Sequence, residues 1–233
     1  MEKYLSEVEL YYSTNVDLEN NKIILEENEF KHIVKVMRHR VENLLYVTDG
    51  LGKIYKTQIS EILKTLVVAK IVEFIEQPDN YKNITFCIPI LKNPDRLKFA
   101  LEKSVELGIT NFVLFSSKRT IGKSKNIERL NKILISAMKQ SLRANLPKIR
   151  LMKFDEIIKL KGKKVAFDQK AQKRFTGEIN KDELSFFIFG PEGGFDKIEL
   201  NYFEESDFFS LSNSRLRSET AVVVCASLLK CNL

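Results

Sequence analysis

The chain has 233 residues, enough for one large hydrophobic core or two modest ones. Its 44% hydrophobic and 30% charged content is typical of a folded globular protein. No apolar stretch reaches the roughly 20 residues of a transmembrane helix, and the acidic N-terminus does not resemble a signal peptide. We therefore expect a cytoplasmic protein with no membrane contact. Two histidines and three cysteines without CxxC spacing predict no metal site.

The net charge of +7 is distributed unevenly along the chain. Residues 118–150 contain ten lysines and arginines against one acid, a net charge of +9, whereas residues 1–30 carry −6. Concentrated positive charge favours contact with a phosphate-bearing polyanion, because lysine and arginine neutralise phosphates. The alternative is that these bases merely solvate the exposed face of a helix.

Residues 1–75 predict a small β-rich domain. Apolar segments separated by turns such as Asp49-Gly50 have the pattern of short strands. One helical segment, residues 29–40, interrupts them, and the polar segment 76–80 with its proline predicts a linker. The predicted strands are residues 22–26, 43–49, 53–62 and 65–75.

From residue 80 onward, predicted strands alternate with predicted helices. Apolar residues recur at helical spacing in residues 94–108, between Ile127 and Met138, and in a final helix at 219–230. This alternation predicts a largely parallel sheet with its ligand site at the carboxyl ends of the strands. The predicted strands are residues 84–91, 112–117, 163–168, 185–190 and 207–212.

The strongest local motif is FFIFGPEGGFD, residues 186–196. An apolar strand leads into three glycines within five residues, and these let backbone groups approach a flat ligand. The alternative is a tight turn that needs positive φ angles. Asp196 and Glu199 then have the spacing of a capping box at the start of a helix.

A second motif, LSNSRLRSETA at residues 211–221, follows the next predicted strand. It places Arg215 and Arg217 beside the start of the final helix, where Glu219 could simply complement the helix dipole. Two such loops after successive strands predict a cleft. Residues 121–124, IGKS, resemble the end of a phosphate-binding loop, but Ser117 stands where its first glycine belongs.

Together these segments resemble the bacterial 16S ribosomal RNA uridine-N3 methyltransferases (RsmE), a branch of the knotted SPOUT methyltransferases. The resemblance covers nearly the whole chain in the same order. The chain departs from the family pattern at Glu42-Asn43 and at Asp168-Gln169. The matching pieces are His32–Arg38, Asp49-Gly50, Lys92 and Arg96 ahead of Lys103–Gly108, Arg119, Gln140–Arg143 with Pro147, GPEGGF and LRSETA.

The resemblance implies an α/β protein with two domains. Residues 1–75 would form a PUA-like RNA-binding β-barrel, and residues 80–233 a SPOUT α/β domain with a trefoil knot and a mostly parallel sheet. It further implies a homodimer that binds S-adenosylmethionine in the knot. The implied reaction is methylation of N3 of one uridine in 16S ribosomal RNA, near the decoding site of the small ribosomal subunit.

The same resemblance implies roles for individual residues. Uridine N3 must lose a proton to become nucleophilic, so Arg217 would stabilise the uridinate and Glu219 would accept the proton. Each arginine could instead be fixed by an ion pair with Glu102, Glu106 or another acid. The cofactor would contact Phe167, Phe189, Gly190, Glu192, Gly193, Leu211, Ser212 and Leu216, and RNA phosphates would contact Arg38, Lys92, Arg96, Arg119 and Arg143.

Two alternatives to this function remain open. One is a SPOUT enzyme with another acceptor, such as a ribose 2′-hydroxyl, and the other is a non-catalytic RNA-binding module. The final helix is apolar nearly all round, so most of its sides must be covered. We expect a second subunit to cover one of them; the alternative is a helix enclosed within its own domain.

Overall fold

A computed structural model describes residues 8–120 and 126–232. The chain divides into two compact units, of which the first comprises Met1–Asp79 and Met138–Leu146. The second comprises Asn80–Ala137 and Pro147–Leu233. The IGKS segment considered above for phosphate binding lies outside the described residues.

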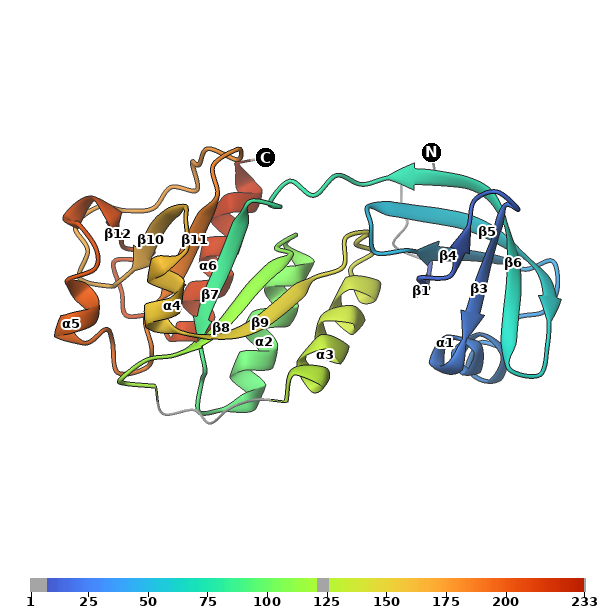
Figure 1. Ribbon diagram of the computed structural model, residues 1–233, viewed down its shortest axis with the longest axis horizontal. Coiled ribbons are helices and arrows are strands. Elements are labelled where there is room, and N and C mark those ends of the chain that lie inside the picture. The colour runs from blue at the N-terminus through green and yellow to red at the C-terminus, as the bar shows by residue number, and fades with distance from the viewer. Residues whose placement is uncertain (1–7, 121–125, 233) are drawn as a thin grey trace. The chain divides into compact units, whose positions relative to one another are not determined.

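The first unit is built on a six-stranded sheet in the order β1-β4-β5-β6-β3-β2 (Figure 1). All of its pairings are antiparallel except that of β1 with β4. Side chains on alternate positions, such as Ile23 and Leu25, point into a core that includes Tyr11, Val47 and Ile59. The strands are β1 (Leu10–Tyr12), β2 (Val16–Asp17), β3 (Lys22–Glu26), β4 (Leu44–Thr48), β5 (Lys53–Ile62) and β6 (Leu66–Glu76).

The helical segment of this unit is shorter than the sequence predicted. Helix α1 (Glu27–Lys31) continues into a π-helical turn, η2 (His32–Val36), instead of running to residue 40. It ends there because Arg38 adopts a left-handed conformation with φ of 57°, which no right-handed helix accommodates. Ile33 anchors the segment in the core.

The segment Met138–Leu146 is an integral part of the first unit. The Ala144 carbonyl accepts hydrogen bonds from the Gly52 amide at 2.9 Å and from Thr48 Oγ1 at 3.2 Å. The Ala144 amide donates to Gln77 Oε1 at 2.8 Å. Gly50 has φ of 77°, and a Cβ there would lie 2.8 Å from Leu146 Cβ. The predicted Asp49-Gly50 turn therefore needs its glycine for two reasons, the positive φ and the close approach of Leu146.

The second unit contains a six-stranded sheet in the order β12-β10-β11-β7-β8-β9, with every pairing parallel. This confirms the predicted α/β class, with a β-rich N-terminal domain and a mostly parallel C-terminal sheet. The strands are β7 (Ile84–Pro89), β8 (Asn111–Ser116), β9 (Lys148–Lys153), β10 (Lys163–Phe167), β11 (Ser185–Phe189) and β12 (Phe208–Phe209).

Helices cover both faces of this sheet because the central strands are apolar on both sides. Phe186 and Ile188 of β11 share a core cluster with Phe154 of α4. Phe187 and Phe189 alternate with them and face the opposite side, where α2 and α6 pack together (Figure 1). The helices are α2 (Pro94–Glu106), α3 (Ile127–Gln140), α4 (Phe154–Lys159), α5 (Lys197–Leu200), η3 (Glu205–Asp207) and α6 (Ser218–Cys231).

The two edge strands of the second sheet differ from the expectations. The predicted strand at 207–212 contracts to β12, two residues that pair only with β10, because the chain beyond them turns into the loop at Leu211. At the other edge, β9 was not predicted. Its exposed Lys148, Arg150 and Lys153 give it a mainly polar pattern that hides the strand period.

Candidate active site

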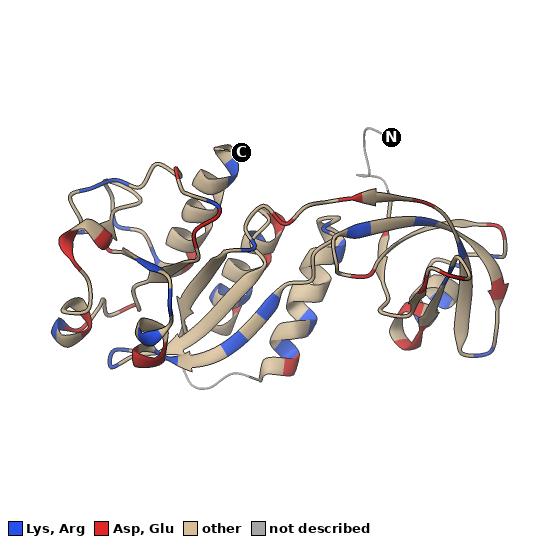
Figure 2. Cartoon of the chain, turned by 45° about the horizontal axis from the view of Figure 1, so that its top comes forward, with Lys and Arg blue, Asp and Glu red and all other residues tan. Residues whose placement is uncertain are grey.

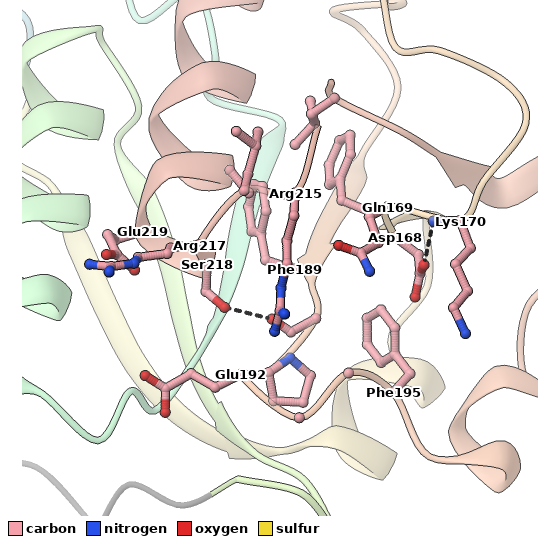
Figure 3. Close-up of a pocket in the computed structure, with 18 of the residues that line it drawn as sticks. Asp168, Gln169, Lys170, Phe189, Glu192, Phe195, Arg215, Arg217, Ser218 and Glu219 are labelled. Atoms are coloured by element: carbon pink, nitrogen blue, oxygen red, sulfur yellow. Dashed lines mark hydrogen bonds between the residues drawn. The ribbon is translucent and has the colours of Figure 1, made fainter. Parts of the chain in front are cut away.

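A cavity of about 970 Å³ opens in the second unit beyond the carboxyl ends of β10 and β11. Three loops line it, at residues 167–170, 189–195 and 211–219, together with Arg96 and Arg119. In Figure 3, Arg217 and Glu219 lie on one side of the pocket and Asp168 and Lys170 on the other. The position agrees with the general rule that parallel α/β sheets bind ligands outside their carboxyl ends.

The glycine loop, residues 190–196, begins where β11 ends. Ser218 Oγ, at the start of α6, donates a 3.1 Å hydrogen bond to the Gly190 carbonyl (Figure 3). The Gly194 amide donates to the Pro191 carbonyl at 2.8 Å and closes a turn. A positive φ, 72°, occurs at Gly194. Gly193 has none, so the expectation that the turn needs positive φ applies to the third glycine and not to the second.

The capping box predicted after this loop is confirmed. Asp196 Oδ1 accepts a hydrogen bond from the Ile198 amide at 3.0 Å, and Glu199 Oε2 accepts one from the Asp196 amide at 2.8 Å. The Ile198 amide lowers the pKa of the Asp196 carboxyl, and Lys118 and Arg119 lower it further. Helix α5 is thus fixed directly behind the glycine loop.

Arg119 contacts the glycine loop directly. Its Nη1 donates a 3.0 Å hydrogen bond to the Gly193 carbonyl, and its Nη2 lies 4.0 Å from Asp196 Oδ2. A Cβ built on Gly193 would lie 3.4 Å from Arg119 Cβ. The arginine side chain and the second glycine therefore pack closely, and a Cβ at Gly193 would already be in van der Waals contact with Arg119.

Arg96 of α2 bridges two acids of the pocket. Its Nη1 lies 3.8 Å from Glu192 Oε1, and its Nε lies 3.5 Å from Glu219 Oε1. Glu219 is only 8% exposed, so this guanidinium offsets much of the cost of burying its carboxylate. The expected alternative of an ion pair is realised for Arg96, but with these acids. Glu102 and Glu106 pair with Lys98 and Lys103 instead.

The serine-arginine loop, residues 211–217, forms the other wall of the pocket. Ser212 Oγ lies 3.0 Å from Ser214 Oγ and accepts the Ser214 amide at 3.1 Å. Arg215 and Arg217 are exposed, and neither forms an ion pair with any acid in the described part of the chain. Their positive charge is therefore available to a ligand.

Aromatic side chains form the apolar floor of the pocket. The rings of Phe167 and Phe189 stack with centroids 5.0 Å apart. Both were predicted as ligand contacts, whereas Phe195, which follows the glycines, was not. Four polar lining residues were not predicted as ligand contacts either, although Ser218 lies within a motif noted in the sequence. They are Asp168, Gln169, Lys170 and Ser218.

The predicted phosphate-binding residues are divided between the two units. Arg96 and Arg119 line the pocket, whereas Lys92 is exposed before α2 and is not among the lining residues. Arg38 and Arg143 belong to the first unit. The basic segment 118–150 is divided as well, and Figure 2 shows its lysines and arginines along α3 and β9.

The arrangement offers charge and backbone groups for chemistry. Within residues 8–120 and 126–232, no cluster of three histidine, cysteine, aspartate or glutamate side chains could hold a metal ion. No helix in those ranges has the length and apolar character to cross a membrane. A carboxylate, exposed guanidinium groups and loops rich in backbone donors and acceptors suit group transfer between bound substrates.

Comparison with known proteins identifies both units. Residues 78–230 match the family model of the RNA methyltransferase domain, and residues 25–72 match that of the RNA methyltransferase PUA domain. The chain is 30% identical to Ribosomal RNA small subunit methyltransferase E of Aquifex aeolicus, over 90% of this chain and 94% of that protein. It is 28% identical to the Rickettsia conorii protein of the same name, over 88% of each.

A solved structure has the same fold. It is the Ribosomal RNA small subunit methyltransferase E of Neisseria gonorrhoeae, crystallised bound to S-adenosyl methionine. Its TM-score is 0.84 at 24% identity, over 97% of this chain and 98% of that one.

Proposed function

The chain belongs to the family of the ribosomal RNA small subunit methyltransferases E. We propose that it transfers a methyl group from S-adenosylmethionine to N3 of a uridine in 16S ribosomal RNA. This reaction would take place in the cytoplasm, where ribosomal subunits are found. The observation that carries the proposal is the pocket. It combines a glycine loop, an aromatic floor and arginines without an acidic partner in the described part of the chain, at the ends of neighbouring parallel strands.

The pocket residues fit S-adenosylmethionine. The cavity volume suits a ligand of this size, and the apolar floor offers a surface for an adenine ring. Glu192 provides negative charge for a cofactor that carries positive charge, and the glycine loop presents backbone groups without side chains. The proposed contacts are Phe167, Phe189, Gly190, Glu192, Gly193, Leu211, Ser212 and Leu216.

We assign the chemistry to Glu219 and Arg217. S-adenosylmethionine supplies the methyl group, whose bond to sulfur breaks as the bond to N3 forms. Glu219 takes the N3 proton onto its carboxylate, and Arg96 keeps that carboxylate in place. Arg217 lines the pocket without an acidic partner among the described residues, so its charge can stabilise the oxygens of the uridinate.

RNA binding would use both parts of the chain. Residues 1–75 act as the PUA-like RNA-binding domain, and residues 80–233 form the SPOUT domain with its trefoil knot. Arg96 and Arg119 already contact the pocket loops, so phosphates would bind to the remaining N–H donors of these guanidinium groups. The proposed phosphate contacts are Arg38, Lys92, Arg96, Arg119 and Arg143.

The protein would act as a homodimer through α6. This helix contacts α2 and β11, and Val222, Cys225 and Leu229 are buried. Val223 and Val224 remain half-buried and apolar, and a second subunit would cover them. Sedimentation at micromolar concentration should give one species of twice 27.0 kDa, and Val224→Glu should shift it toward the monomer. A single species near 27.0 kDa for the unaltered chain would contradict the dimer.

The reaction is tested by mapping the product. Small ribosomal subunits that lack the modification are incubated with the protein and isotopically labelled S-adenosylmethionine, and the nucleotides are mapped by mass spectrometry. We expect one labelled 3-methyluridine. Label on a ribose 2′-hydroxyl would identify another acceptor. RNA binding with neither transfer nor cofactor binding would identify a non-catalytic RNA-binding protein.

A further inference from the structure

Two short helices of the second unit begin with a similar side-chain cap, but their glutamates have different surroundings. In α4, Glu156 Oε2 accepts the Lys153 amide at 2.7 Å, and the side chain is exposed. In α5, Glu199 Oε2 accepts the Asp196 amide at 2.8 Å, but this side chain is only 4% exposed. A capping box alone does not require such burial.

The other oxygen of Glu199 has a distant partner. Its Oε1 accepts the backbone amide of Lys118 at 3.2 Å, across a sequence separation of 81 residues. Lys118 belongs to the turn that follows β8, in which the Ser117 amide donates to Thr120 Oγ1 at 2.8 Å. One buried carboxylate therefore joins the β8 turn to the residue that ends the glycine loop.

The next residue of the same turn makes a second attachment. Arg119 Nη1 donates to the Gly193 carbonyl at 3.0 Å, and Lys118 Nζ lies 3.7 Å from Asp196 Oδ1. The β8 turn thus attaches to the glycine loop at Gly193 through Arg119 and behind it through Glu199. Both attachments start from the end of a strand whose side chains are buried from Phe112 to Phe115.

We propose that Glu199 and Arg119 form a clasp that holds the glycine loop in the conformation that binds the cofactor. Glu199 is the positioning residue of this clasp and does not itself contact the cofactor. Three glycines give the loop a large conformational entropy, and they provide no side chains to anchor it. Without the clasp, the loop would lose its conformational entropy only when the cofactor binds, and this loss would weaken cofactor binding. The proposal rests on the proposed use of S-adenosylmethionine.

The test compares Glu199→Gln with Glu156→Gln as a matched control. Each change removes one carboxylate oxygen from a glutamate that accepts a helix-start amide, but only Glu199 also joins two loops. We expect the Kd and the KM for S-adenosylmethionine to rise by about 10-fold in Glu199→Gln, with kcat changed less than about 2-fold. The control should bind the cofactor like the unaltered protein. Equal affinity in Glu199→Gln and the unaltered protein would overturn the clasp.

A double-mutant cycle separates the clasp from general destabilisation. If Glu199 and Arg119 hold the same loop, Arg119→Ala should cost less affinity in the Glu199→Gln background than in the unaltered protein. Additive losses would show two independent effects and would contradict a shared clasp.

Hydrogen exchange tests the clasp without any cofactor. In the ligand-free protein, Glu199→Gln should speed amide exchange at Lys118 and across residues 193–196, and Glu156→Gln should not. Unchanged exchange would overturn the clasp. If the unaltered protein failed to bind S-adenosylmethionine but the two variants differed in exchange as described, the proposed function would fail and the clasp would stand.

Discussion

The two loops that form the walls of the pocket are held in opposite ways. The glycine loop receives hydrogen bonds or ion pairs from Arg96, Arg119 and Ser218, which lie on three other segments of the chain. The serine-arginine loop is held by bonds between its own serines, and Arg215 and Arg217 remain open to solvent. The loop with three glycines is fixed mainly by its neighbours, whereas the loop with two arginines keeps both of them available for the substrate.

The largest expected effect is on kcat and comes from a substitution in the serine-arginine loop. Arg217→Ala should lower kcat by about 100-fold, because it removes a positive charge that stabilises the developing transition state. The affinity for S-adenosylmethionine, measured by titration calorimetry, should change by less than about 2-fold. Arg215→Ala on the same loop is the control and should reduce kcat far less. Equal losses in kcat and cofactor affinity for Arg217→Ala would show that the two walls share one role.

A smaller effect, on cofactor affinity, is expected for a substitution in the glycine loop. Gly193→Val should weaken S-adenosylmethionine binding by about 10-fold, or about 1.4 kcal/mol, because its side chain would press against Arg119. Gly193→Ala, whose single Cβ fits at 3.4 Å from Arg119 Cβ, should cost less. Circular dichroism would verify that both variants fold. Unaltered affinity in a folded valine variant would remove Gly193 from the cofactor site.

The smallest effect distinguishes Arg119, which holds the glycine loop and is also a proposed phosphate contact, from Arg143, which is proposed to bind RNA alone. Arg143→Ala should reduce the slope of log affinity against log salt concentration for RNA by about one, and leave cofactor binding unchanged. Arg119→Ala should weaken cofactor binding, because it removes the hydrogen bond to the Gly193 carbonyl. Filter binding over a series of salt concentrations measures the slope. If Arg119→Ala changed only the slope, the guanidinium would belong to the RNA surface.

The sequence predicts those parts of the fold in which one physical pattern dominates. The central strands β7, β8, β10 and β11 are short apolar runs, and α2 and α3 have a clear helical period, so all six were predicted. Strand β9 was missed because an edge strand with exposed lysines lacks that apolar signal. The π-helical turn at His32–Val36 was missed because its sequence also suits an α-helix.

In the candidate site, too, local motifs predicted some features and left others unpredicted. Both loops follow from local motifs, and most of the ligand contacts that the resemblance implies lie on them. The ion pair of Arg96 with Glu219 joins residues that are 123 positions apart, and the bond from Lys118 to Glu199 spans 81. Such partners depend on how strands are ordered in the sheet, and no local pattern in the sequence encodes that order.

The composition of the first unit limits how a gene could be rearranged. Because Met138–Leu146 belongs to this unit, a gene fragment for residues 1–79 would encode an incomplete first unit. Thr48 and Gln77 would lose the partners that Ala144 provides, and Gly50 would lose its contact with Leu146. The coding sequences of the two units are therefore interleaved. A recombination event at the linker alone would separate residues 1–79 from residues 138–146, so it would not transfer the first unit intact.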